Sequence, residues 1–85
     1  MCKVMKQLLY FGGSFCPACK ALWPVVEKEA PEKGYEVKYY DMDEEEGAFA
    51  ADDMRVKSLP TIIILSEDGV ELKRAVGNTA WKEVQ

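Results

Sequence analysis

The sequence predicts an α/β fold in which a mixed four-stranded sheet is flanked by helices, in the order βαβαββα. An apolar run at residues 8–11 precedes a stretch with helical periodicity and a second strand-like segment at residues 35–42. A β-branched apolar run at residues 61–65 leads through a turn into a fourth strand. Because a strand–helix–strand crossover gives parallel pairing and a hairpin gives antiparallel pairing, the sheet is expected to contain both.

The first strand and the first helix are separated by a pair of glycines. The apolar run at residues 8–11 ends at Gly12-Gly13, and Ser14 is a candidate cap for the helix that follows. From residue 16 to residue 30 the apolar positions recur at spacings of three and four. They are Ala18, Leu22, Val25, Val26 and Ala30. The prolines and the glycine of this region predict a kink at Pro24 and a helix end at Pro31 and Gly34.

The second half of the chain supplies the remaining elements. The acidic run at residues 43–46 suits the first turn of a short helix, whose Phe49 and Met54 are expected to face the core. The uninterrupted apolar run at residues 61–65 predicts a strand that is buried on both faces. Residues 66–69 (Ser-Glu-Asp-Gly) form a hairpin turn, and residues 70–76 return as the fourth strand. A short helix at residues 78–85 closes the chain, with Trp81 and Val84 on one side.

Length and composition narrow the classes of function. Eighty-five residues without a linker or a repeat predict a single domain over residues 1–85. A net charge of -4 argues against a nucleic-acid groove and against binding to an anionic membrane. The absence of histidine from the sequence excludes Ser-His and Cys-His nucleophile pairs and zinc sites with imidazole ligands.

Cysteine usage and hydropathy predict where the protein works. Three cysteines are an odd number, which is unusual for a secreted domain held together by disulfides. The apolar run near the N-terminus is too short for a signal sequence, and no segment approaches the length of a membrane span. We expect a cytoplasmic monomer in a reducing compartment, with Cys2 as an incidental free thiol.

The reactive pair is Cys16 and Cys19, which stand at the junction of a strand and a helix. A thiolate at Cys16 would be stabilised by the free N–H groups and the positive dipole end of the helix, which lower the pKa of a thiol. Pro17 suits the first helical position because it has no N–H and its φ is preset. Cys19 lies one turn further, where it can attack a mixed disulfide formed at Cys16.

The same spacing also occurs in half of a zinc ribbon, so a structural metal site has to be considered. A tetrahedral thiolate site requires a second pair of cysteines, and Cys2 is the one further cysteine of the sequence. With no histidine to complete the site, redox chemistry without a metal or another cofactor is the stronger prediction.

Several motifs together resemble the thioredoxin superfamily, from about Gln7 to Trp81. They lie at residues 15–20 (Phe-Cys-Pro-Ala-Cys-Lys), at Pro24, at residues 58–61 (Ser-Leu-Pro-Thr) and at residues 76–77 (Val-Gly). The resemblance implies a thioredoxin-like fold without the extra strand and helix that often precede it. It also implies that Pro60 is cis and packs beside the cysteines, and that the backbone at Leu59 pairs with an extended substrate. The substrate-binding residues expected from the resemblance are Phe15, Pro17, Ala18, Leu59, Pro60, Val76 and Gly77.

Two features depart from typical thioredoxins. A proline directly after the first cysteine is a habit of glutaredoxins, although residues 77–79 (Gly-Asn-Thr) make a poor glutathione site. Tyr10 stands where thioredoxins usually bury an aspartate that helps to deprotonate the resolving thiol. Resolution at Cys19 would then use water or the nearby Lys20, or proceed more slowly, and the sequence does not distinguish these routes.

The sequence therefore predicts a thiol–disulfide oxidoreductase that reduces protein disulfides by dithiol exchange. Its expected partners are disulfide-bearing proteins and a thioredoxin reductase or another electron donor. Two alternatives remain at this point. One is a glutathione-dependent exchanger of the glutaredoxin type, and the other is a non-catalytic binding module with a thioredoxin fold.

Overall fold

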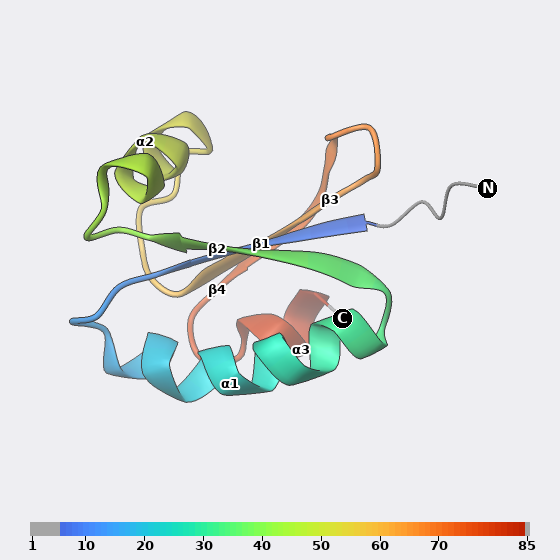
Figure 1. Cartoon of the computed structure of the whole chain (residues 1–85), viewed down its shortest axis with the longest axis horizontal. Helices are drawn as coiled ribbons and strands as arrows, with labels where there is room; N and C mark the ends of the chain where they lie inside the picture. Colours follow the sequence, from blue (N-terminus) through green and yellow to red (C-terminus); the bar gives the residue numbers. More distant parts are fainter. Residues whose placement is uncertain (1–5, 85) are drawn as a thin grey trace.

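The computed structural model describes residues 6–84, which form four strands and three helices in the predicted order (Figure 1). In chain order they are β1 (Lys6–Gly12), α1 (Pro17–Glu32), β2 (Tyr35–Asp41), α2 (Glu45–Asp53), β3 (Thr61–Leu65), β4 (Glu71–Val76) and α3 (Ala80–Val84). None of the described helices is long and apolar enough to cross a membrane. Cys2 lies outside the described residues.

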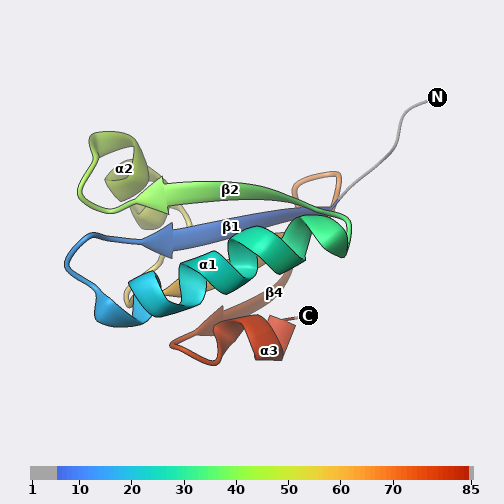
Figure 2. The same cartoon turned by 60° about the horizontal axis from the view of Figure 1, so that its bottom comes forward.

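The strands form one sheet in the order β2-β1-β3-β4. Strand β1 pairs with β2 in parallel, and the other two pairings are antiparallel. Helices α1 and α3 cover one face of the sheet and α2 lies on the other (Figures 1 and 2). The mixed sheet and its flanking helices confirm the predicted fold class.

The larger core lies between the sheet and the pair α1 and α3. Because side chains alternate across a strand, every second residue of β1 and β3 points to this face. The helices contribute the residues that recur at three- and four-residue spacings. Its buried members include Leu8, Tyr10, Leu22, Val26, Ala30, Ile62, Ile64, Trp81 and Val84. The other face of β3 packs under α2, so all five residues of this strand are buried, as predicted.

Helix α1 differs from its prediction at both ends. Cys16, not Ser14, is the N-cap, and its sulfur accepts a hydrogen bond from the N–H of Cys19. Pro31 lies inside the helix, which ends at Glu32, so the prediction that this proline ends it was wrong. The chain turns at Gly34, whose φ of 90° is easily reached by glycine.

Helix α2 contacts the sheet through its smallest residues. The prediction that Phe49 faces the core was wrong, because its side chain is 67% exposed. Met54 does pack against the smaller core between α2 and the sheet, as predicted. Gly47 and Ala51 are one turn apart and both are buried. Phe49 is two residues from each of them and therefore points to the opposite side of the helix. The close approach of α2 to the sheet leaves no room for a larger side chain in place of Gly47.

Candidate functional site

The two cysteines lie just beyond the carboxyl end of β1. Pro17 occupies the first turn of α1, as predicted, and Cys16 precedes it with extended backbone angles. The Sγ atoms of Cys16 and Cys19 form a disulfide, and the Cα atoms are 5.3 Å apart. Cys16 is half-buried, whereas Cys19 is only 2% exposed. The two sulfurs are therefore unequal, since a bulky partner can approach Cys16 much more readily than Cys19.

The free N-terminal groups of α1 act directly on the outer sulfur. The N–H of Cys19 points at the Sγ atom of Cys16 with an N–S distance of 3.2 Å. A sulfur that accepts such a bond at a helix N-terminus is stabilised as an anion. This arrangement is what the sequence predicts for the attacking thiol. The exposed Lys20 adds a positive charge in the same turn.

The loop between β1 and α1 is fixed to the segment that follows β2. The backbone N–H and the hydroxyl of Ser14 both donate to the carboxylate of Asp43. These bonds hold the pKa of the Asp43 carboxyl below its ordinary value. The N–H of Met42 also donates to the carbonyl of Gly12 at 2.8 Å. Ser14 therefore anchors the loop that precedes the cysteine pair, although it does not cap the helix.

A groove of about 470 Å³ opens beside Cys16. Its lining is mainly apolar and comes from the loop before α1, from the end of β2 and from the segment between α2 and β3. The lining residues are Phe15, Cys16, Met42, Val56, Lys57, Ser58 and Leu59. Phe15 is 68% exposed, so its ring forms an outer edge of the groove. A partner chain lying in this groove would pass the reachable sulfur.

Some of the predicted binding residues line the groove, and the others lie outside its lining. Phe15, Cys16 and Leu59 line the groove. The Leu59–Pro60 peptide bond is cis, and the carbonyl of Pro60 accepts a hydrogen bond from Gly77 at 2.9 Å. The other predicted residues do not line it: Pro17 and Val76 are exposed, and Ala18 is half-buried on α1.

Four of the lining residues were not among the predicted site residues: Met42, Val56, Lys57 and Ser58. Met42 and Val56 carry no local signal of a binding role, because their place depends on how β2 and α2 end. Ser58 had a signal, since it belongs to the Ser-Leu-Pro-Thr motif at residues 58–61. Lys57 directly precedes the same motif, so its place near the groove could also be expected.

Tyr10 lies beneath the cysteine pair in a cluster of aromatic rings. Its side chain is fully buried, and its hydroxyl donates to the backbone carbonyl of Cys19 at 2.9 Å. The Tyr10 ring lies 5.0 Å from the ring of Trp23 and 5.6 Å from that of Tyr39, centroid to centroid. Burial, together with Tyr39, raises the pKa of Tyr10 above its ordinary value, so this side chain stays neutral. A neutral donor therefore supports the backbone of the inner cysteine.

The Tyr10→Phe variant is expected to lower the free energy of unfolding by about 1 kcal/mol, because it removes one buried hydrogen bond and little packing. Urea unfolding measures this change. Tyr39→Phe is the matched control, since Tyr39 belongs to the same cluster but is partly exposed. Equal losses in the two variants would contradict a specific role for the bond from Tyr10 to Cys19.

Comparison with known proteins gives the family directly. The family model described as Thioredoxin matches residues 3–85. A thioredoxin from Mycolicibacterium smegmatis is 39% identical over 72 residues, which cover 82% of this chain and 63% of that protein. The match therefore spans somewhat less than two thirds of that relative's length.

Solved structures agree in fold. Fasciola hepatica thioredoxin superposes with a TM-score of 0.81 at 29% identity, covering 95% of this chain and 76% of that one. Thioredoxin 1 from Thermosipho africanus gives a TM-score of 0.79 at 28% identity, covering 92% of this chain and 84% of that one. The family model covers both the cysteine pair and the segment of the cis-proline. The chain belongs to the thioredoxin family.

Proposed function

We propose that this chain is a thiol–disulfide oxidoreductase that reduces the disulfides of other proteins through Cys16 and Cys19. The observation that carries the proposal is the asymmetry of the pair. Cys16 caps a helix and borders an apolar groove, whereas Cys19 is buried behind it. Such an arrangement suits one sulfur that attacks a partner and a second that acts only within the chain.

The exchange balances as a transfer of two electrons and two protons. The Cys16 thiolate attacks one sulfur of the partner's disulfide, and the other partner sulfur leaves as a thiolate. Cys19 then attacks the Cys16 sulfur of the mixed disulfide, which releases the second partner sulfur. The proton of Cys19 and one from the medium complete the two partner thiols, and Cys16 and Cys19 are left oxidised.

The groove is proposed to hold the partner segment around its disulfide. We propose that the backbone of Leu59, which lines the groove, pairs with an extended segment of the partner, and that Phe15 supplies an apolar edge. We include Pro17, Ala18, Pro60, Val76 and Gly77 in the surface that the partner contacts. The groove walls are apolar except near Lys57 and Ser58, so we expect the partner segment to be largely apolar.

The dithiol is restored by a thioredoxin reductase or by another electron donor. We propose that the protein acts as a monomer and a single domain in the cytoplasm, where reducing conditions favour this direction of flow. No metal or other cofactor is needed for the exchange. Reduction by glutathione alone, faster than by a thioredoxin reductase, would instead indicate an exchanger of the glutaredoxin type.

The reduction potential of the Cys16–Cys19 pair tests the proposed direction. Equilibration in thiol redox buffers is expected to give a value of about -230 mV or lower, as in reducing members of the superfamily. The fraction oxidised is counted by alkylation and mass spectrometry. A value between about -120 and -180 mV would contradict a reductant and indicate formation or isomerisation of disulfides.

A further inference from the structure

One wall of the groove is formed by the segment that joins α2 to β3. Residues 56–59 of this segment line the groove opposite Phe15 and Cys16. At its far end the segment is held by the bond from Gly77 to the carbonyl of Pro60. The position of the wall therefore depends on what holds its near end, where the chain leaves α2.

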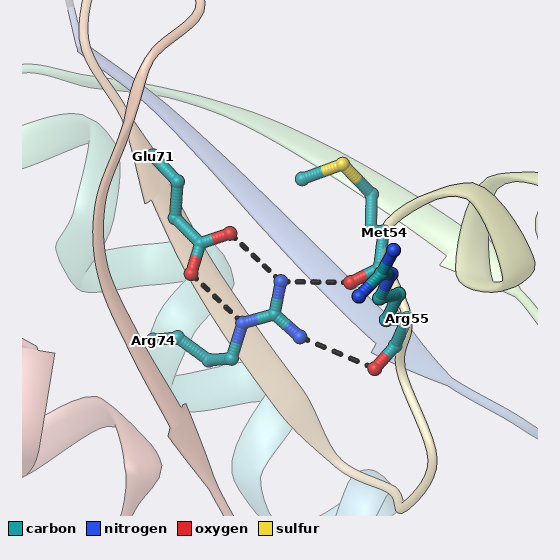
Figure 3. Close-up of polar contacts among 4 residues, drawn as sticks. All are labelled: Met54, Arg55, Glu71 and Arg74. Carbon is teal, nitrogen blue, oxygen red and sulfur yellow. Dashed lines mark hydrogen bonds and ion pairs between the residues drawn. The ribbon is translucent and has the colours of Figure 1, made fainter.

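The near end is a tight turn with an unusual backbone. Arg55 has a φ of 58°, a left-handed conformation that residues other than glycine adopt infrequently. The turn is closed by the N–H of Val56, which donates to the carbonyl of Ala51 at 2.8 Å. This is the bond of a Schellman-type helix end. The turn also directs the carbonyl groups of Met54 and Arg55 toward β4 (Figure 3).

Arg74 of β4 binds both of these carbonyl groups. One terminal nitrogen donates to the oxygen of Met54 at 2.7 Å, and the other donates to the oxygen of Arg55 at 3.3 Å. Arg74 pairs with Ile63 in the sheet, so its side chain rises on the face that carries α2. Figure 3 shows the guanidinium lying between β4 and the turn.

Glu71 fixes the orientation of the guanidinium. Its two carboxylate oxygens accept bonds from Arg74 at 2.9 and 2.7 Å, and this contact holds the pKa of the Glu71 carboxyl below its ordinary value. With Glu71 on one side and two carbonyl groups on the other, the planar group has a single favourable orientation. A lysine in its place could not form this arrangement, because its ammonium is a compact point charge without the rigid fork.

We propose that Arg74 is a positioning residue for the substrate groove. It holds the turn at Arg55 against β4, and this sets the distance between residues 56–59 and the opposite wall at Phe15 and Cys16. Arg74 lines neither the groove nor the cysteine pair, so it acts on binding and not on the sulfur chemistry. The proposal rests on the proposed function, because it assumes that protein disulfides bind in this groove.

This role predicts different effects on large and small substrates. A protein disulfide needs both walls of the groove, so a displaced wall weakens its binding. A small aromatic disulfide such as 5,5′-dithiobis(2-nitrobenzoic acid) needs mainly access to Cys16. Loss of Arg74 should therefore raise KM for the protein substrate and leave kcat and the reaction with the small disulfide unchanged.

The test uses Arg74→Gln and Arg74→Lys, with Lys73→Gln as the matched control. The control removes a positive charge from the same strand, at a residue that pairs with Ile64 and faces away from α2. For insulin, whose disulfides serve as the protein substrate, a catalytic amount of each protein is kept reduced by dithiothreitol. The small disulfide is mixed separately with each reduced protein in the absence of dithiothreitol. We expect both Arg74 variants to raise KM for insulin by about fivefold, and the control to stay within about twofold of the parent protein.

The failure of this proposal can be distinguished from failure of the proposed function. If the parent protein reduces insulin and both Arg74 variants match it in KM, the positioning role is wrong and the function stands. Equal losses on insulin and on the small disulfide would also overturn the role, since they indicate a general structural effect. If Arg74→Gln does not fold, Arg74→Lys alone decides, because it keeps the charge and removes the fork. A parent protein that reduces neither substrate contradicts the proposed function itself.

Discussion

Cys19→Ser is expected to accumulate a covalent complex with a disulfide-bearing protein, whereas Cys16→Ser is expected to form none and to lose exchange activity by more than about a thousandfold. The reason lies in the unequal exposure of the two sulfurs. Cys16 borders the groove and accepts a bond from the N–H of Cys19, while Cys19 is 2% exposed. Without Cys19, the mixed disulfide formed at Cys16 lacks the internal thiol that would release it.

Both variants are best made together with Cys2→Ser, so that one thiol remains in each protein. Each variant is incubated with an excess of native insulin, whose disulfides are intact. Non-reducing electrophoresis and mass spectrometry then measure the trapped complex. Addition of dithiothreitol should release it. Equal trapping by the two variants would show that the buried sulfur is as reactive as the outer one, and would contradict the assigned roles.

Gly47→Ala is expected to lower the free energy of unfolding by about 3 kcal/mol or more. Glycine inside a helix ordinarily gains stability from such a change, by up to about 1 kcal/mol. Here a Cβ atom would overlap the carbonyl oxygen of Asp41 and lie 2.5 Å from its carbonyl carbon. These are backbone atoms of β2, so the helix must move away from the sheet to make room. Urea unfolding measures the loss.

Gly34→Ala is the matched control for this prediction. Gly34 has a φ of 90°, and a Cβ atom there would meet nothing within 4 Å. Alanine in this position suffers backbone strain alone, which costs about 1–2 kcal/mol. A loss at Gly47 that is smaller than the loss at Gly34 would show that α2 can shift without cost, and would contradict the tight contact between α2 and β2.

The elements of this chain could be predicted because local patterns and the fold agree. The β-branched run at residues 61–65 requires burial on both faces, and the fold supplies it by packing α1 and α3 on one face of β3 and α2 on the other. The turn at residues 66–69 closes as expected, with the N–H of Gly69 donating to Ser66 and a φ of 88° at Gly69. The cysteine pair was located for the same reason, since its place after a strand and a glycine pair fixes it at a helix N-terminus.

Apart from Pro31, which α1 accommodates within its last turn, the failures concern contacts between elements that are distant in sequence. Phe49 is apolar and was assigned to the core, but the approach of α2 to β2 is so close that small residues occupy the contact. Ser14 has the side chain of an N-cap, yet Asp43 binds its hydroxyl, and Cys16 caps the helix. Arg74 looks like an ordinary solvated charge in the sequence. Its role depends on the turn at Arg55, which no local pattern indicates.

The charges of β4 also bear on whether this protein stays soluble at high concentration. Within residues 6–84, β4 pairs with β3 on one side and with no strand on the other, so a row of backbone groups is available to a second chain. Leu72 and Val76 are each 48% exposed along this edge. A strand added there would lie beside the charged residues Glu71, Lys73 and Arg74, and the irregular register at residues 64–65 interrupts the regular pairing of β4. The charges of β4, which include the ion pair at the groove wall, thus also disfavour the addition of a second chain to this open edge.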